Sequence, residues 1–154
     1  MSHEIDLSFL DLPEILEIMF PFVYSSFPFY FQGRPSKPGN YIDIGEGIRI
    51  GYGFFAKSRE SPTILYFHGN GEVVSDYSAI APIYNQKNIN LFVVEYRGYG
   101  QSNGYPTITN MLRDAHPIFR EFREVIEKEG YKQSIFIMGR SIGCIPAIEL
   151  AYHY

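Results

Sequence analysis

The order of apolar and polar positions along the chain predicts alternating strands and helices. Three short runs are apolar on both faces, as buried strands of a parallel sheet require. Between and after these runs, apolar residues recur at spacings of three and four, which is typical of helices packed on such a sheet. The strands are expected at residues 63–67, 89–96 and 134–138, and the helices at 73–86, 107–129 and from 142 onward.

The amino-terminal third of the chain follows a different pattern. A short helix is expected at residues 11–19, and residues 41–55 alternate in a way that predicts two strands in a hairpin. We therefore expect an amino-terminal extension, residues 1–40, that packs on the core of a domain formed by residues 41–154. The expected fold class is α/β, a mostly parallel sheet flanked by helices with an antiparallel hairpin at its start.

Composition narrows the class of protein. The chain has 154 residues, of which 45% are hydrophobic and 19% charged, so it is expected to be globular. A net charge of −4 argues against nucleic acid as a partner. Cys144 is the only cysteine, which excludes an internal disulfide and fits a reducing compartment. The acidic amino terminus lacks the pattern of a signal peptide, so a cytoplasmic location is expected.

Residues 19–31 are strongly apolar and aromatic. The segment is too short to cross a bilayer as a helix, and Pro21 and Pro28 interrupt it. It is expected either to pack on the core of its own domain or to form a surface that touches lipid or acyl chains, as a peripheral membrane contact.

Loops that carry candidate chemistry follow the three apolar runs. The carboxyl ends of parallel strands meet at one edge of a sheet, so "HGNG", "RGYGQS" and "GRSIG" are expected close together. The last of these, Gly139-Arg140-Ser141-Ile142-Gly143, leads from a strand straight into a helix. Such a turn lifts the serine hydroxyl above the sheet, so Ser141 is a candidate nucleophile. The alternative is a serine that only caps the helix.

The "HGNG" loop offers the electrostatic partner of such a nucleophile. Acyl transfer places negative charge on a carbonyl oxygen, and backbone N–H groups of an oxyanion hole stabilise that charge. The candidate donors are the amides of Asn70 and Ile142, with Gly69 and Gly71 keeping the loop backbone exposed. His68 is expected to brace the loop through hydrogen bonds. The alternative is an ordinary glycine-rich turn.

In these three loops the chain resembles the amino-terminal half of an α/β-hydrolase. The motifs "HGNG", "YRGYGQS" and "GRSIG" occur in family order within residues 41–154. The resemblance implies an α/β-hydrolase fold truncated after the nucleophile elbow. It is closest to serine hydrolases with a small cap or none, which include esterases, thioesterases and protein depalmitoylases. It implies Ser141 as nucleophile and Asn70 and Ile142 as oxyanion donors, acting on a carboxylic ester or thioester.

The chain departs from the family pattern after the serine. The family order is serine, acid, histidine, but the residues after Ser141 offer only Glu149 and His153. Along a helix, His153 would lie about 18 Å from the serine, and His116 about 13 Å from the level of the strand ends. A general base must come within about 3 Å. The chain is therefore expected to lack the acid and histidine of the triad and to be inactive alone.

Two other functions stay open. The chain could be a non-catalytic interaction protein that retains the fold, or a nucleotide-binding doubly wound domain. The second lacks support, because no Gly-x-Gly-x-x-Gly and no Gly-Lys-Ser/Thr motif follows a strand. No cofactor is expected, and no metal, because no cluster has metal-ligand spacing. The expected partners are a small-molecule or acyl-ester substrate and other copies of the chain, paired through an exposed strand at 134–138.

Overall fold

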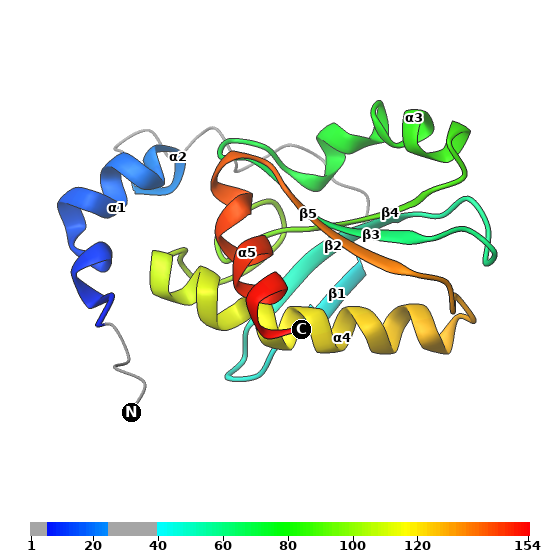
Figure 1. The fold of residues 1–154 in the computed structure, drawn as a ribbon. Coiled ribbons are helices and arrows are strands. Elements are labelled where there is room, and N and C mark those ends of the chain that lie inside the picture. The colour runs from blue at the N-terminus through cyan, green and yellow to red at the C-terminus, as the bar shows by residue number, and fades with distance from the viewer. Residues whose placement is uncertain (1–5, 25–39) are drawn as a thin grey trace.

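A mixed sheet forms the centre of the fold (Figure 1). The structure is a computed structural model, and it describes residues 6–24 and 40–154. The sheet has five strands in the order β1-β2-β4-β3-β5. The strands are β1 Asn40–Asp43, β2 Arg49–Phe55, β3 Thr63–Phe67, β4 Asn90–Val94 and β5 Ile135–Gly139.

The sheet combines parallel and antiparallel pairs. Strands β4, β3 and β5 are parallel neighbours, whereas β2 pairs antiparallel with both β1 and β4. The α/β class, the flanking helices and the initial hairpin are thus confirmed. The sheet is mixed rather than mostly parallel, because the second strand of the hairpin joins the parallel strands in the opposite direction.

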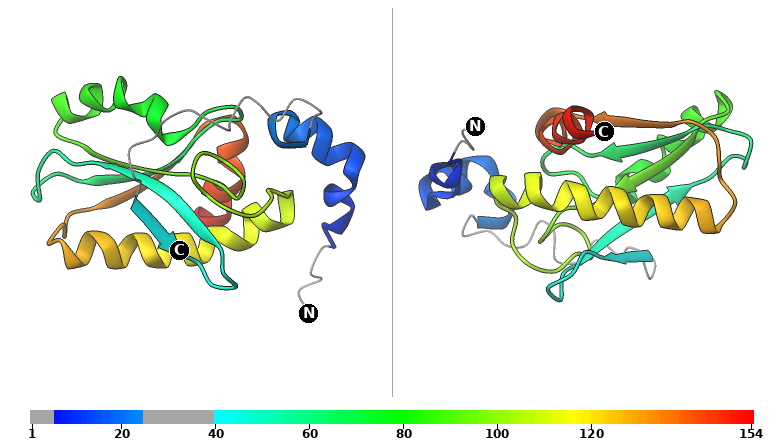
Figure 2. Two further views of the ribbon diagram at one scale, coloured as in Figure 1. Left: turned by 180° about the vertical axis from the view of Figure 1, so that it is seen from behind. Right: turned by 60° about the horizontal axis from the view of Figure 1, so that its bottom comes forward.

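Helices cover both faces of the sheet. Helices α4 and α5 lie on one face and α3 lies over the other (Figures 1 and 2). The helices are α1 Pro13–Met19, α2 Pro21–Tyr24, α3 Ala81–Gln86, α4 Ile108–Lys128 and α5 Cys144–His153, with 3-10 turns at Ser8–Asp11, Val74–Ser78 and Ser141–Gly143.

Strand β4 shows how the sheet divides its side chains between the two layers. Phe92 and Val94 belong to the larger core cluster, which includes residues of α4 and α5. Leu91 and Val93 belong to a second cluster with Ala81 of α3. Successive side chains of a strand point to opposite faces, so a continuous apolar run fills both cores.

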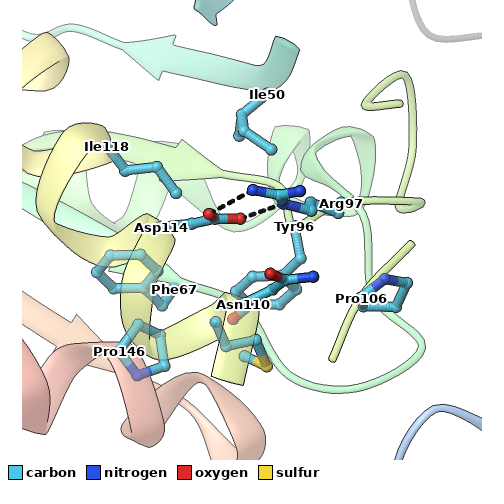
Figure 3. A pocket seen from close by; sticks show the side chains of 10 residues that line it. Ile50, Phe67, Tyr96, Arg97, Pro106, Asn110, Asp114, Ile118 and Pro146 are labelled. Atoms are coloured by element: carbon cyan, nitrogen blue, oxygen red, sulfur yellow. Dashed lines mark hydrogen bonds and ion pairs between the residues drawn. The ribbon is translucent and has the colours of Figure 1, made fainter. Parts of the chain in front are cut away.

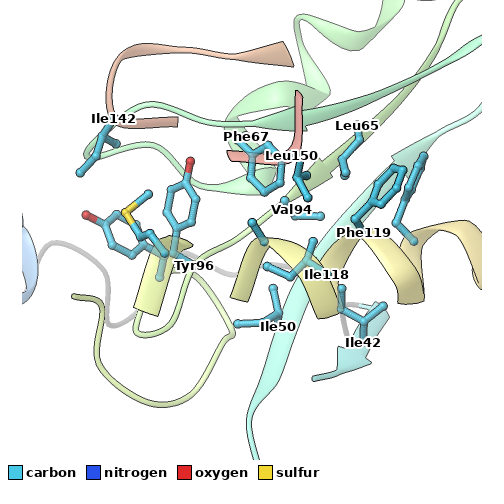
Figure 4. Packing of buried hydrophobic residues seen from close by; sticks show 14 of the residues in the cluster. Ile42, Ile50, Leu65, Phe67, Val94, Tyr96, Ile118, Phe119, Ile142 and Leu150 are labelled. Atoms are coloured by element: carbon cyan, nitrogen blue, oxygen red, sulfur yellow. The ribbon is translucent and has the colours of Figure 1, made fainter. Parts of the chain in front are cut away.

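The larger cluster lies between the sheet and α4 (Figure 4). Thr107 begins the helix by accepting a hydrogen bond from the amide of Asn110 at 3.0 Å, and Gly130, with φ of +86°, follows its end. The apolar stripe expected from the sequence faces the core. Buried members of the cluster include Ile42, Ile50, Leu65, Phe67, Val94, Ile118, Phe119 and Leu150.

The helix expected at residues 73–86 is divided into two elements. A 3-10 turn at Val74–Ser78 is followed by the separate helix α3. Pro82 lies in the first turn of α3, where its missing N–H is tolerated. Pro82 would break a continuous helix that began at residue 73, because its ring clashes with the carbonyl four residues earlier.

The described amino-terminal residues pack against the domain. Phe20 is fully buried in the larger cluster. The hydroxyl of Tyr24 donates to the carbonyl of Pro106 at 2.7 Å, and Thr109 donates from its amide (3.2 Å) and its hydroxyl to the carboxylate of Asp11. These bonds connect the amino-terminal helices to the start of α4.

The remainder of the apolar segment, residues 25–31, lies outside the described residues. None of the helices that the structure describes has the length and apolar content needed to cross a bilayer. Peripheral membrane contact and a cytoplasmic location remain predictions.

Strand β5 lies at the end of the described sheet. It pairs with β3, and the side chains of Phe136 and Met138 are 56% and 41% exposed. An apolar edge strand with unpaired backbone groups is a template for pairing with another chain.

We expect this edge to cause self-association. Replacing both Phe136 and Met138 by lysine should weaken association of the 154-residue chain by about tenfold, because like charges would then face each other across paired strands. Ile148→Lys is the matched control, since Ile148 is 68% exposed on α5. Light scattering over a concentration series measures the effect. A monomeric wild-type chain at the highest concentration would contradict the expectation.

Candidate active site

The turn between β5 and α5 places Ser141 at the surface. Ser141 is exposed and has a φ of +53°, in the left-handed region. For a residue other than glycine this conformation costs roughly 1–2 kcal/mol, so neighbouring contacts must hold it. One such contact is the hydrogen bond from the amide of Gly143 to the carbonyl of Arg140, at 2.9 Å.

The flanking glycines are required by close backbone contacts. A Cβ added to Gly139 would lie 2.2 Å from the carbonyl oxygen of Gly143, and one added to Gly143 would lie 2.2 Å from that of Phe67. The amide of Arg140 donates to the same Phe67 carbonyl at 3.0 Å. The turn at 139–143 therefore lies directly against the end of β3.

His68, the first residue after β3, is completely buried. Its Nδ1 lies 2.9 Å from the carbonyl oxygen of Gly69 and its Nε2 lies 3.0 Å from Oε2 of Glu95. The hydroxyl of Tyr96 donates to the His68 carbonyl at 2.5 Å. Both ring nitrogens are thus engaged, one within its own loop and one by Glu95 after β4, so His68 is not placed to take a proton from Ser141.

The side chain of Asn70 is fixed on both sides. Its Oδ1 accepts from the hydroxyl of Tyr99 at 2.7 Å, and its Nδ2 donates to the carbonyl of Met19 at 2.8 Å. Burial, followed by the nearby charge of Glu95, raises the pKa of Tyr99, which keeps its hydroxyl protonated as a donor. Within residues 6–24 and 40–154, no acceptor binds the backbone amides of Asn70 or Ile142.

Glu72 connects the loop after β3 to the turn that carries the serine. Its carboxylate accepts from the amide of Gly69 at 2.7 Å and from the hydroxyl of Tyr77 at 2.7 Å. The same carboxylate forms an ion pair with Arg140, the residue before Ser141. One side chain therefore binds both of the loops that carry candidate site residues.

The loop after β4 is attached to α4 by a bidentate ion pair (Figure 3). Arg97 donates to Asp114 through Nε at 2.5 Å and through Nη2 at 2.7 Å. Both side chains are largely buried, and hydrogen bonding to Asp114 raises the pKa of Arg97. The pair lines a small internal cavity of about 10 Å³, too small for a ligand.

The other described histidines, His116 of α4 and His153 of α5, meet near the carboxyl-terminal end of α5. His116 Nε2 is 2.9 Å from Oε1 of Glu149, and His153 Nδ1 is 3.2 Å from the same oxygen. Glu149 and His153 follow Ser141 by two to three helical turns. At 1.5 Å per residue, Glu149 lies about 12 Å and His153 about 18 Å from Ser141 along the helix axis. His3 lies outside the described residues. The described part of the chain thus places no free imidazole beside Ser141.

Sequence reasoning missed two supporting carboxylates, Glu72 and Glu95. Glu95 directly follows the apolar run of β4, at the edge where the candidate loops gather, and that position is itself a usable signal. Glu72 lies three residues after Gly69, the spacing at which a carboxylate reaches back to a backbone amide. Its second partner, Arg140, could not be found from local spacing.

Comparison of the sequence with models of protein families identifies the family of this chain. The family model described as "Serine aminopeptidase, S33" (Hydrolase_4) matches residues 58–154, well over half of the chain. The chain belongs to this α/β-hydrolase family.

Individual curated proteins match about 60% of the chain. Alpha/beta hydrolase domain-containing protein 17B of Homo sapiens is 33% identical over 97 residues, which cover 60% of this chain and 32% of that protein. Protein bem46 of Schizosaccharomyces pombe is 36% identical over 97 residues, covering 62% and 32%. The chain thus spans about a third of the length of the curated relatives it matches.

A solved structure supports the fold. Est1E from Butyrivibrio proteoclasticus, solved with ferulic acid, has a TM-score of 0.56 and 19% identity over 71% of this chain and 45% of that one. This likeness concerns the fold of the chain and extends over most of it.

Replacing Gly143 by alanine should lower the free energy of unfolding by about 3 kcal/mol, because its Cβ would overlap the backbone at Phe67. Gly47→Ala is the control, because it adds backbone strain without a steric overlap. Gly47 has a φ of +73° but no atom within 4 Å of its added Cβ, so a loss of about 1 kcal/mol is expected. Urea unfolding measures both. Equal losses would show that the close contact is not what requires glycine at 143.

Replacing Glu72 by alanine should lower the free energy of unfolding by about 1–3 kcal/mol, because the amide of Gly69 and the hydroxyl of Tyr77 lose their acceptor. Hydrogen exchange at the Gly69 amide should also accelerate. Glu60→Ala, at an exposed carboxylate, is the control and should stay within about 0.5 kcal/mol of wild type. Unchanged exchange at Gly69 would mean that Glu72 does not order the loop.

Proposed function

We propose that the protein is a serine hydrolase that cleaves carboxylic esters or thioesters. Ser141 is the proposed nucleophile, and the amides of Asn70 and Ile142 are the proposed oxyanion donors. The observation that carries the proposal is the left-handed φ of Ser141 in an exposed turn whose flanking glycines lie against the end of β3. Membership of a hydrolase family supports the class of reaction.

The proposed reaction proceeds through an acyl-enzyme. The Oγ of Ser141 attacks the carbonyl carbon while its proton passes to a base. The carbonyl oxygen becomes negative and accepts hydrogen bonds from the two amides, each of which contributes about a hundredfold or more in rate. Collapse of the tetrahedral intermediate releases the alcohol or thiol, which takes up the proton. Water then hydrolyses the acyl-serine and releases the acid.

The base is proposed to come from outside residues 1–154. Both ring nitrogens of His68 are engaged, by the Gly69 carbonyl and by Glu95, and His116 and His153 share Glu149 near the end of α5. The chain spans about a third of its curated relatives, and family members place the acid and histidine after the serine. The 154-residue chain alone is therefore expected to be nearly inactive.

The substrate class rests on the acyl chemistry of the site. An exposed serine acting with the two proposed amide donors would suit attack on a planar carbonyl carbon. A protein of similar fold, Est1E, was solved with a carboxylic acid, ferulic acid. A non-catalytic interaction protein with the same fold is the alternative, and the following experiment separates the two.

Hydrolysis of an activated nitrophenyl ester should be measured for the longest reading frame that contains this sequence and for residues 1–154 alone. We expect turnover by the first, reduced at least about 10³-fold by Ser141→Ala, and almost none by the second. Ser134→Ala, at an exposed serine before β5, should leave turnover unchanged. Turnover that survives Ser141→Ala would refute the nucleophile. Ser141-dependent turnover by residues 1–154 would show that they contain the base.

A further inference from the structure

Three potential metal ligands meet between α4 and α5. His116 belongs to α4, and Glu149 and His153 belong to α5. One ligand atom from each of the three lies within 4.8 Å of the others. The closest pairs join Oε1 of Glu149 to Nε2 of His116 at 2.9 Å and to Nδ1 of His153 at 3.2 Å.

Helix geometry explains the convergence. Glu149 and His153 are four residues apart, so they lie on the same face of α5. The carboxyl-terminal half of α5 lies beside α4 (Figures 1 and 2). Across this interface His116 of α4 contacts Glu149 on that face. The rings of His116 and His153 stand edge to face with centroids 5.0 Å apart. The cluster is thus set by the packing of two helices.

The spacing suits a four-coordinate ion. With bonds of about 2.0–2.1 Å to nitrogen and oxygen, ligand atoms of a tetrahedral zinc site lie about 3.3 Å apart. The two pairs that include Glu149, at 2.9 and 3.2 Å, are close to that value, and the ligand nitrogens of the two imidazoles lie within 4.8 Å of each other. The side chains of His116, Glu149 and His153 are 32%, 23% and 46% exposed, so an ion can enter without unfolding either helix.

The surroundings favour a cation and leave one coordination position open. The cluster lies at the carboxyl-terminal end of α5, where the helix dipole is negative. His116 and Glu149 also line a surface cavity of about 510 Å³, which leaves room for water as a fourth ligand. Arg113 lines the same cavity, but its guanidinium is engaged with Glu46 at 3.4 Å and Asp114 at 3.7 Å.

We propose that His116, Glu149 and His153 form a binding site for a divalent transition-metal ion, best matched by Zn²⁺. Two imidazoles and one carboxylate suit zinc better than magnesium, which prefers oxygen ligands. Nδ1 of His153 also lies 2.9 Å from the carbonyl oxygen of Glu149. The carbonyl oxygen can only accept, so Nδ1 carries the proton in this contact. Binding an ion would replace this hydrogen bond and leave the ring proton on Nε2. Bound zinc would join α4 to α5 and stabilise the fold.

Calorimetric titration of the 154-residue chain, purified without a histidine tag, with zinc chloride tests the site. We expect saturable binding of one ion and no comparable binding of magnesium chloride. His116→Ala, Glu149→Gln and His153→Ala should each weaken binding at least tenfold. Zinc at a hundredfold excess over Kd should raise the Tm by about 5 °C or more.

Matched variants keep the test specific. Glu127→Gln changes a carboxylate of α4 outside the cluster, and Ile148→Ala changes an exposed residue of α5 outside it. Both should bind zinc like wild type. Circular dichroism identifies any variant that fails to fold, and His153→Ala, the most exposed ligand, then decides the result. No saturable zinc binding, or binding that all three ligand variants retain, would overturn the proposal.

Discussion

The direct contact between the backbone at Gly143 and the end of β3 is the constraint on which the candidate site depends. A side chain at 143 would overlap the carbonyl of Phe67, which lies 2.2 Å from the position of its Cβ. Because glycine leaves that space free, the turn at 139–143 can lie against the end of β3. Ser141 then faces outward, with a φ of +53°. A larger residue would separate the two segments whose amides the proposed chemistry uses.

Buried hydrogen bonds then hold the loops in place. Glu95 is central, since one oxygen lies 3.0 Å from His68 and the other accepts from the amide of Val74 at 2.9 Å. Buried polar groups of this kind are stable only when fully partnered, and among the described residues no buried side-chain nitrogen or oxygen lacks a partner. A carboxylate and an imidazole committed in this way support the loop and are not free for proton transfer.

Much of this arrangement could be predicted from the sequence, because the relevant signals are local. The apolar runs predict the parallel strands, and the spacing of Gly139, Ser141 and Gly143 predicts the turn. The sequence pattern does not predict that the segment 73–86 divides before Pro82. Proline is a local signal, but the apolar pattern continues across it. The ion pair of Glu72 with Arg140 and the cluster around Glu149 join segments far apart in the chain, so only the packed structure brings them together.

Helix α5 connects the two proposed sites while keeping them too far apart for direct contact. Its amino-terminal end follows Ser141, where the positive end of the helix dipole favours a developing oxyanion, and its carboxyl-terminal end favours a cation. About ten residues at 1.5 Å each separate the ends, roughly 15 Å, so an ion beside His153 could not touch a substrate at Ser141. Bound metal would therefore act on how firmly α5 is held, and through it on the turn, rather than on the reacting atoms.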